Sequence, residues 1–196
     1  MNKRILLTSF DTFSGHYNAS RNLAQKYLNR LGSDCEHLPL SVDDHGVKKL
    51  VSSLKNASPD GIIMLGEHSG ISSLRLETKA NPIPQSLLSS SAILNNLLVF
   101  LHGPIHLLCF YLEHESWFVR GPCRSLTDKN IEIKDSDFNY FYCNAVYRVG
   151  LQWGDKQNPR NPVAFVHVPK KEHPSEEDVV ALEKIVLKMR ETIKSS

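Results

Sequence analysis

The chain has 196 residues, a length that predicts one domain spanning residues 1–196. Hydrophobic residues make up 41% of it and charged residues 22%, which supports a packed core and excludes wholesale disorder. With 23 basic and 21 acidic side chains the net charge is +2, too small to indicate nucleic acid as a partner. Ten glycines and ten prolines exclude a fibrous protein.

Two apolar stretches bear on the compartment of the protein. The first, at the start of the chain, ends at Asp11 and is too short for the apolar region of a signal peptide. The second, residues 97–112, contains Gly103 and Pro104 and is shorter than the ~20 apolar residues of a membrane span. The cysteines lie far apart in the chain, at Cys35, Cys109, Cys123 and Cys143. We therefore expect a cytoplasmic protein with reduced cysteines and no membrane association.

In the first half of the chain, short apolar runs alternate with amphipathic stretches. Residues 4–10, 36–40 and 61–65 are predicted strands, and helical spacing of apolar residues predicts helices within 18–31 and 47–54. The run 61–65 is apolar at every position, which is typical of a central parallel strand covered by helices on both faces.

The second half predicts fewer elements. Residues 163–168 form a strong strand candidate and 131–133 a weaker one, while no boundaries are assigned within 82–127. Ser175 and Asp178 have the spacing of a capping box at the start of a C-terminal amphipathic helix. The alternation of strands and helices predicts an α/β fold, a single-domain three-layer α/β/α arrangement with a mainly parallel twisted sheet.

Cys143 is a candidate nucleophile. It immediately precedes an apolar helical pattern, and the unpaired N–H groups of a helix N-terminus favour thiolate over thiol. The same N–H groups can face an oxyanion. The alternative is a buried apolar cysteine, which is the more common situation for an isolated cysteine in such a context.

His167 and Glu77 are candidate partners of that thiol. His167 lies at the end of an apolar strand followed by Pro169, at the carboxyl edge where α/β sheets place functional groups. It could take the thiol proton and return it to a leaving amine, although a structural histidine is the common alternative. Glu77 lies in an alternating segment after the third predicted strand, where an isolated carboxylate is usually exposed.

Two further patterns are weak. His102 and His106, with Cys109 and His114 nearby, have a metal-like spacing, but the intervening Gly-Pro disrupts the helix that would align them, so we expect no metal site. Residues 66–70 follow a strand and could hold an anion, yet they match neither a Walker loop nor a nucleophile elbow.

Several motifs in order resemble pyroglutamyl peptidase I (pyrrolidone-carboxylate peptidase), a family of cysteine peptidases. Residues 9–14 and 18–20, Ser-Phe-Asp-Thr-Phe-Ser and Asn-Ala-Ser, are similar to the family's G-F-D-P-F-G and N-P-S. Residues 66–73 are similar to its G-Q-A-G-G-R-S-S, which precedes a catalytic glutamate. Residues 141–144 and 165–169 are similar to F-V-C-N and F-I-H-V-P.

The resemblance implies an omega-peptidase that cleaves the amide bond after an N-terminal pyroglutamyl residue through a thioester. In it Cys143 is the nucleophile, His167 the general base and acid, and Glu77 the residue that orients the imidazole. The implied substrate-binding residues are Phe10, Phe13, Glu67 and Tyr142, the two phenylalanines forming aromatic walls of the ring slot. No metal or cofactor is implied. The expected partners are peptides with a blocked N-terminus, not nucleic acid or membrane, and a homo-oligomer is compatible with the sequence.

Some positions depart from the family motifs. Glu67 replaces a glutamine, Phe138 and Asn139 replace two small residues, and residues 82–86 contain no counterpart of the arginine that follows the family's glutamate. Two alternatives to the peptidase therefore stay open. One is a catalytically weak or inactive homologue that binds a lactam or blocked peptide N-terminus without turnover. The other is an omega-peptidase with altered ring specificity.

Overall fold

The computed structural model describes residues 4–12, 15–31, 35–80, 117–118, 128–134, 141–157 and 161–195. The strands are β1 (Ile5–Phe10), β2 (Cys35–Leu40), β3 (Gly61–His68), β4 (Leu74–Glu77), β5 (Lys79–Ala80), β6 (Trp117–Phe118), β7 (Ile131–Lys134) and β8 (Val163–Pro169). The helices are α1 (Ala19–Leu31), α2 (Asp44–Ala57), α6 (Phe141–Lys156) and α7 (Glu176–Ser195).

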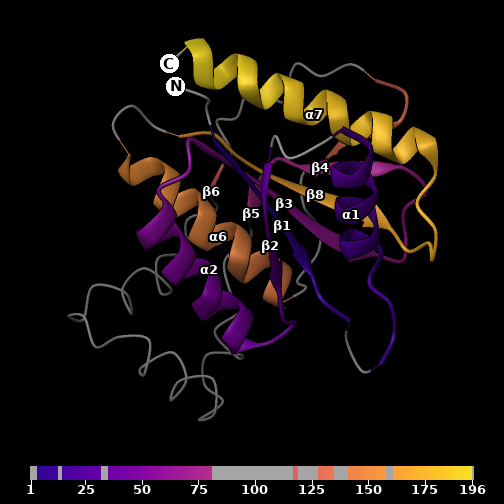
Figure 1. Ribbon diagram of the computed structural model, residues 1–196, viewed down its shortest axis with the longest axis horizontal. Helices are drawn as coiled ribbons and strands as arrows, with labels where there is room; N and C mark the ends of the chain where they lie inside the picture. The colour runs from indigo at the N-terminus through magenta and orange to yellow at the C-terminus, as the bar shows by residue number, and fades with distance from the viewer. Residues whose placement is uncertain are drawn as a thin grey trace.

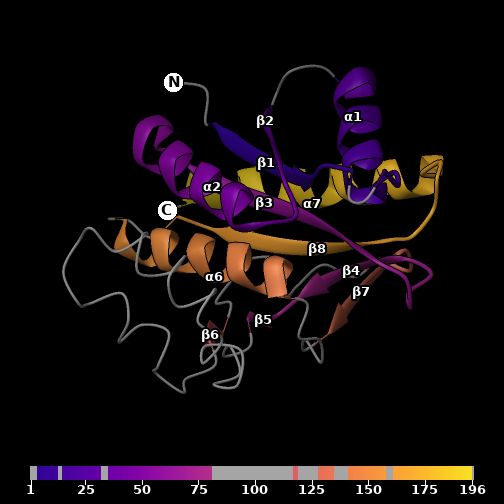
Figure 2. The ribbon, with the colours of Figure 1, turned by 90° about the horizontal axis from the view of Figure 1, so that it is seen from below.

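A mixed sheet with the strand order β2-β1-β3-β8-β4-β7 forms the centre of the molecule. Strands β2, β1, β3 and β8 run parallel, whereas β4 pairs antiparallel with β8 and parallel with β7. Figure 2 shows β4 and β7 at the end of the sheet away from β1 and β2. A short antiparallel pair, β5 with β6, is separate from this sheet. The prediction of a mainly parallel sheet is confirmed.

Helices cover both faces of the sheet, as the apolar strands require. Every residue of β1 and β8 is buried, which a strand achieves only when both its faces are covered. On one face α1 and α7 pack through residues such as Leu23 and Leu182, and on the other α2 and α6 pack through Leu50 and Val146. Figure 1 shows α7 on one side of the sheet and α2 and α6 on the other. The predicted three layers are present.

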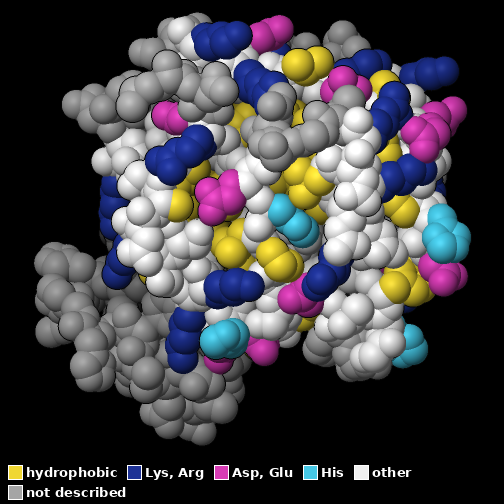
Figure 3. All heavy atoms as spheres, viewed as in Figure 1, with side chains coloured by type: hydrophobic (Ala, Val, Ile, Leu, Met, Phe, Trp, Pro, Cys, Tyr) yellow, Lys and Arg dark blue, Asp and Glu magenta, His cyan; other side chains and the backbone are white. Residues whose placement is uncertain are grey.

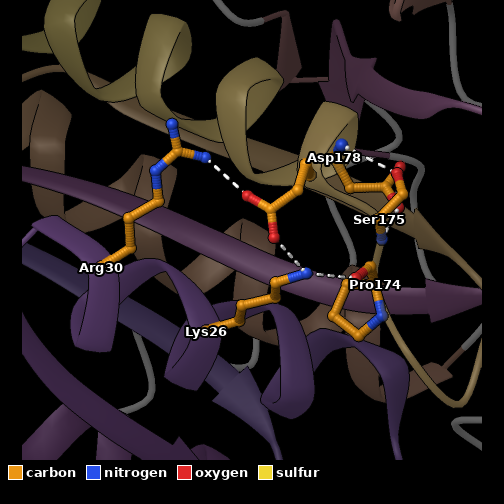
Figure 4. A network of polar contacts seen from close by, with 6 residues as sticks. Lys26, Arg30, Pro174, Ser175 and Asp178 are labelled. Atoms are coloured by element: carbon orange, nitrogen blue, oxygen red, sulfur yellow. Dashed lines mark hydrogen bonds and ion pairs between the residues drawn. The ribbon is translucent and has the colours of Figure 1, made fainter.

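The start of α7 joins it to α1. Ser175 and Asp178 form the predicted capping box: the Asp178 N–H donates to the Ser175 hydroxyl at 3.1 Å, and the Ser175 N–H donates to the Asp178 carboxylate at 2.8 Å. Figure 4 shows Lys26 and Arg30 of α1 reaching the same end of α7, where they pair with Glu176 at 2.6 and 2.7 Å. These contacts fix the two helices on one face.

The third strand is longer than its sequence pattern predicts. The apolar run predicts residues 61–65, but the strand continues to His68 because its last residues pair in register with the end of β8. The extension matters because it places Gly66, Glu67 and His68 on a strand rather than in a loop. Of the segment 82–127, only Trp117–Phe118 is described, so the apolar run 97–112 and the histidines near 102–114 lie outside the described residues.

The surface has mixed charge. On the face shown in Figure 3, basic and acidic side chains are interspersed in the coloured part of the chain. A search of the described helices finds none whose length and apolar character would allow it to cross a bilayer. Cys35 and Cys143 form no disulfide bond within the described part of the chain, and the other two cysteines lie outside it.

Candidate active site

Strand pairing gathers the chemically active side chains on one face of the sheet. Gly66 of β3 pairs with His167 of β8, which pairs in turn with Arg75 of β4, while Glu77 pairs with Phe165. Directly paired residues share a face of the sheet, and so do residues two apart on a strand. The register therefore puts these five residues on the face covered by α6.

His167 and Glu77 form a buried pair on this face. The imidazole Nδ1 donates a hydrogen bond to the Glu77 Oε1 at 2.6 Å, and both side chains are 0% exposed. This bond places the proton of a neutral ring on Nδ1, leaving Nε2 as the basic nitrogen. The sequence pattern alone favours an exposed Glu77, but the strand pairing of β4 with β8 buries it.

The thiol of Cys143 lies over Gly66. A Cβ added at Gly66 would be 3.0 Å from the Cys143 Sγ and 2.8 Å from the Phe165 Cζ, so a side chain there would displace one or the other. Because Gly66 pairs with His167, the thiol sits above the same two strands as the imidazole. Figure 2 shows α6, whose first turn bears Cys143, alongside β8.

The second turn of α6 is held to β4 by a tyrosine. The Tyr147 hydroxyl donates to the backbone carbonyl of Glu77 at 2.9 Å, and the tyrosine is 1% exposed. Tyr147 lies one helical turn after Cys143, so this bond connects the helix of the thiol with the strand of the carboxylate. The Tyr147 ring also packs against Phe165, with ring centroids 5.3 Å apart.

The surroundings of Cys143 favour the thiol over the thiolate. Burial raises the pKa of Cys143 to about 12, the negative charges of Glu77 and Glu67 add to the rise, and a backbone hydrogen bond at Cys143 opposes it. This shift acts against the expectation that the helix N-terminus favours a thiolate. Cys143 lies in the first turn of α6, where the unpaired N–H groups favour the thiolate and desolvation favours the thiol.

The imidazole is neutral for a related reason. Burial lowers the pKa of His167 to about 3, and the positive charge of Arg75 lowers it further. Arg75 itself donates from Nε to the Glu132 carboxylate at 2.9 Å. Both shifts favour a thiol and a neutral imidazole over an ion pair of Cys143 and His167.

Two of the expected substrate-binding aromatic residues lie on the same side of the sheet as the thiol. Phe10 is 3% exposed and belongs to the apolar cluster against which Tyr142 and Cys143 pack. Tyr142 is half-buried, and burial together with the nearby Asp44 and Asp43 carboxylates raises its pKa. Phe13, the other predicted wall of the slot, lies outside the described residues.

Glu67 points to α1. Its Oε2 accepts the backbone N–H of Ala19, the first residue of α1, at 2.7 Å, and its Oε1 is 3.9 Å from the Lys170 Nζ. A carboxylate at a helix N-terminus is stabilised by the partial positive charge there. The carboxylate therefore anchors α1 to the end of β3, and its charge still contributes to the raised pKa of Cys143.

Sequence reasoning missed several residues that shape the site. Gly66 belongs to the motif of residues 66–73, but its close approach to the thiol was not predicted, and Tyr147 was not singled out at all. Both roles depend on the distance between α6 and the sheet. Arg75 and His68 are brought to His167 only by strand register. The T-shaped packing of Phe165 on His167, with centroids 4.9 Å apart, likewise has no sequence signal beyond an apolar strand.

The described residues include no group of three or more His, Cys, Asp or Glu side chains arranged to hold a metal ion. The chemically active groups that the structure gathers are the thiol, the imidazole and the carboxylate. Together they can supply the three roles of nucleophilic catalysis: a nucleophile, a base and a group that orients the base.

Solved structures of known enzymes share this fold. Pyrrolidone carboxyl peptidase from Thermococcus litoralis superposes with a TM-score of 0.70 at 19% identity, covering 98% of this chain and 96% of that one. The corresponding enzyme from Fervidobacterium islandicum gives 0.67 at 19%, covering 96% and 99% of the two chains. Pyroglutamyl peptidase I from Bacillus amyloliquefaciens gives 0.66 at 17%, covering 96% and 95%.

The sequence matches no protein-family model, and a search of curated proteins finds no match. At 17–19% identity the structural similarities show the fold alone. The fold expected from the resemblance is confirmed: the chain has the α/β architecture of the pyroglutamyl peptidases over nearly its whole length and theirs.

Proposed function

We propose that the protein is a cysteine peptidase that hydrolyses the amide bond after an N-terminal pyroglutamyl residue. The observation that carries the proposal is the buried hydrogen bond of 2.6 Å between His167 Nδ1 and Glu77 Oε1, beside strand β3, over which the Cys143 thiol lies. A neutral imidazole with its proton held on Nδ1 presents Nε2 as a base toward a neighbouring thiol. The names of the structural neighbours support the choice of substrate class.

The reaction begins with a thiol, so proton transfer accompanies attack. His167 Nε2 takes the proton from Cys143 Sγ as the sulfur forms a bond to the carbonyl carbon of the pyroglutamyl residue. The carbonyl oxygen becomes an oxyanion, and N–H groups in the first turn of α6, which a helix leaves without intrahelical partners, stabilise it. Glu77 holds the ring and stabilises the imidazolium that forms.

Collapse of this intermediate breaks the carbon–nitrogen bond. The imidazolium returns its proton to the leaving nitrogen, which departs as the free amine of the shortened peptide, and a thioester remains on Cys143. Water then attacks the thioester while His167 Nε2 takes one of its protons. The second collapse releases pyroglutamic acid, and the proton returns to the sulfur, which restores the thiol and the neutral imidazole.

The surroundings of the thiol suit a neutral ring as substrate. Phe10 belongs to the apolar cluster on which Tyr142 and Cys143 pack, so aromatic side chains share the face of the sheet that carries the thiol. A lactam ring carries no α-ammonium group, and an apolar slot with few polar groups binds it without an unpaired charge.

A second candidate function is binding of a lactam or blocked N-terminus without turnover. The observation that favours it is the pair of shifted pKa values, about 12 for Cys143 and about 3 for His167, both of which oppose a thiolate–imidazolium pair. Forming the thiolate–imidazolium pair therefore costs free energy. Fast turnover requires that binding of the oxyanion at the first turn of α6 offset this cost.

The test is hydrolysis of a fluorogenic L-pyroglutamyl amide by the reduced protein, compared with the Cys143→Ala variant. L-prolyl amide, which has the same ring with an amine in place of the lactam, is the matched substrate. We expect cleavage of the pyroglutamyl amide only, and loss of at least about 10³-fold in the variant. Cleavage of other capped amides would indicate altered ring specificity.

Calorimetric titration of Cys143→Ala with a pyroglutamyl amide separates the two candidates. Binding to the variant with no cleavage by the folded wild type supports the binding function. Absence of both binding and cleavage overturns both.

A further inference from the structure

A second histidine lies against His167. His68 ends β3 two residues after Gly66, so it shares the face of the sheet with Gly66 and His167. The two imidazole rings have centroids 5.2 Å apart and meet at an interplanar angle of 75° in a T-shaped arrangement. His167 is fully buried, whereas His68 is partly exposed, so solvent protons reach His68 first.

A backbone contact fixes the neutral form of His68. The N–H of Gly70 donates to His68 Nδ1 at 2.9 Å, which makes Nδ1 an acceptor and places the proton of the neutral ring on Nε2. Protonation of Nδ1 removes this acceptor and breaks the bond. The turn after β3 therefore holds the ring in its neutral state.

The charges around His68 come from three neighbouring strands. Positive charge on His167 of β8 and on Arg75 of β4 opposes protonation of His68, while Glu77 of β4 and Glu132 of β7 favour it. Burial is the largest of these effects, and together they lower the pKa of His68. Coupling between two groups is reciprocal, so a proton on His68 opposes a proton on His167 equally.

We propose that His68 is a positioning residue for the His167 base, a role that rests on the proposed function. With a neutral His68, His167 can take the Cys143 thiol proton and become an imidazolium. With a protonated His68, the same transfer creates two adjacent cations, and the step is suppressed. The acceptor of the Cys143 proton is always His167 Nε2. His68 changes only the free energy of this transfer and exchanges no atoms with the substrate.

The sign of the effect on pH dependence follows from the coupled pair. When pH falls, a pair of interacting bases takes up its first proton at a pH equal to or higher than the pH at which either base alone would be protonated. Because His68 is the more exposed ring, this first proton goes to His68 and inactivates the pair while His167 is still neutral. Replacing His68 by an uncharged residue leaves only the protonation of His167, which occurs at lower pH.

The kinetic test compares His68→Gln, His68→Lys and the exposed-residue control His173→Gln. We measure kcat/KM for the pyroglutamyl amide from pH 4 to pH 9. In His68→Gln the ratio of kcat/KM at pH 5 to that at pH 8 rises severalfold above wild type, since the first protonation is gone. In His68→Lys, kcat/KM at pH 8 is at least about tenfold below that of His68→Gln, because a unit charge within ~5 Å opposes the imidazolium at every pH.

A purely structural role predicts other results. If His68 only supports the turn, both substitutions lower kcat/KM in parallel, and the ratio between pH 5 and pH 8 stays that of wild type and of His173→Gln. That outcome overturns the proposal. Thermal unfolding of each variant confirms that the compared proteins are folded.

A second measurement does not require turnover. The C2–H resonances of His68 and His167 are followed by NMR between pH 3 and pH 8 in the resting protein. We expect the His167 resonance of the wild type to move at the pH where His68 titrates, and this response to disappear in His68→Gln. Independent titration of the two rings overturns the proposal. A coupled titration in a protein that cleaves no pyroglutamyl amide supports the histidine pairing and rejects only the proposed function.

Discussion

The hydroxyl of Tyr147 donates to the backbone carbonyl of Glu77 at 2.9 Å, and through this bond the helix of the nucleophile is attached to the strand of the orienting carboxylate. Cys143 and Tyr147 are one turn apart on α6, while Glu77 ends β4. The bond therefore fixes two of the three catalytic candidates relative to one another without using either functional side chain.

Tyr147→Phe removes this bond and leaves the packing intact. We expect the free energy of unfolding to fall by about 1–2 kcal/mol, since a buried carbonyl loses its donor. We also expect kcat/KM to fall about threefold to tenfold, because the thiol is less firmly placed. Urea unfolding and steady-state kinetics measure the two effects. Tyr27→Phe, a similarly buried tyrosine on the opposite face, is the control. Equal activity in the two variants would contradict the positioning role.

Gly66→Ala tests the close approach of the thiol to β3. The added methyl group meets Phe165 Cζ at 2.8 Å and Cys143 Sγ at 3.0 Å, so the ring of Phe165 must shift and the thiol is pushed away from β3. A displacement of a few tenths of an ångström to one ångström predicts a loss of up to about 10²-fold in kcat/KM.

Gly61→Ala is the matched control for that variant. At Gly61 the new methyl group meets the flexible ends of Ile193 and Met189, at the other end of the same strand. We expect it to cost stability, about 1–3 kcal/mol, but not activity. Comparable kinetics for the two alanine variants would show that the thiol does not depend on Gly66.

Much of the fold could be predicted because the periodicity of hydrophobic residues and the helix-capping residues are local signals in the sequence. The continuous apolar runs of β1, β3 and β8 and the capping box at Ser175 each specify their element without reference to the rest of the chain. The antiparallel insertion of β4 beside β8 could not be predicted, because a strand of four residues carries no information on its partner. The end of β3 was missed because Glu67 and His68 break the apolar run.

The three catalytic candidates could be named from the sequence, but their electrostatics could not be predicted. A cysteine before a helix and a histidine at a strand end are two of them, and Glu77 precedes both in the chain. Burial depends on tertiary contacts, and it shields Glu77 from solvent and raises the pKa of Cys143. Arg75 and His68 reach His167 through register alone, which no local pattern encodes.

The resting thiol can be tested by alkylation. With a pKa of about 12, Cys143 is roughly one part in 10,000 thiolate at pH 8. We expect its rate of reaction with iodoacetamide to rise nearly tenfold for each pH unit from 8 to 11, without a plateau. Site-resolved mass spectrometry separates it from the other cysteines, and a model cysteine peptide gives the reference rate. A plateau below pH 9 would indicate a preformed thiolate–imidazolium pair instead.

Glu67→Gln separates the two effects of the Glu67 carboxylate. Glutamine can still accept the N–H of Ala19 at the start of α1, but the interaction of a negative charge with the helix N-terminus is lost. We expect the free energy of unfolding to fall by about 1 kcal/mol and the melting temperature by a few degrees. The Glu67 carboxylate also raises the pKa of Cys143, so its removal lowers this pKa and makes the thiol more reactive.

The variant is therefore expected to be less stable and more reactive. Its alkylation rate at pH 9 rises severalfold over wild type, because the thiolate fraction grows as the pKa falls. Glu172→Gln, which removes an exposed carboxylate after β8, is the control and leaves the rate unchanged. If Glu67→Gln lowers stability without raising the alkylation rate, its carboxylate acts on α1 alone. The departure from glutamine at this position then has no bearing on the thiol.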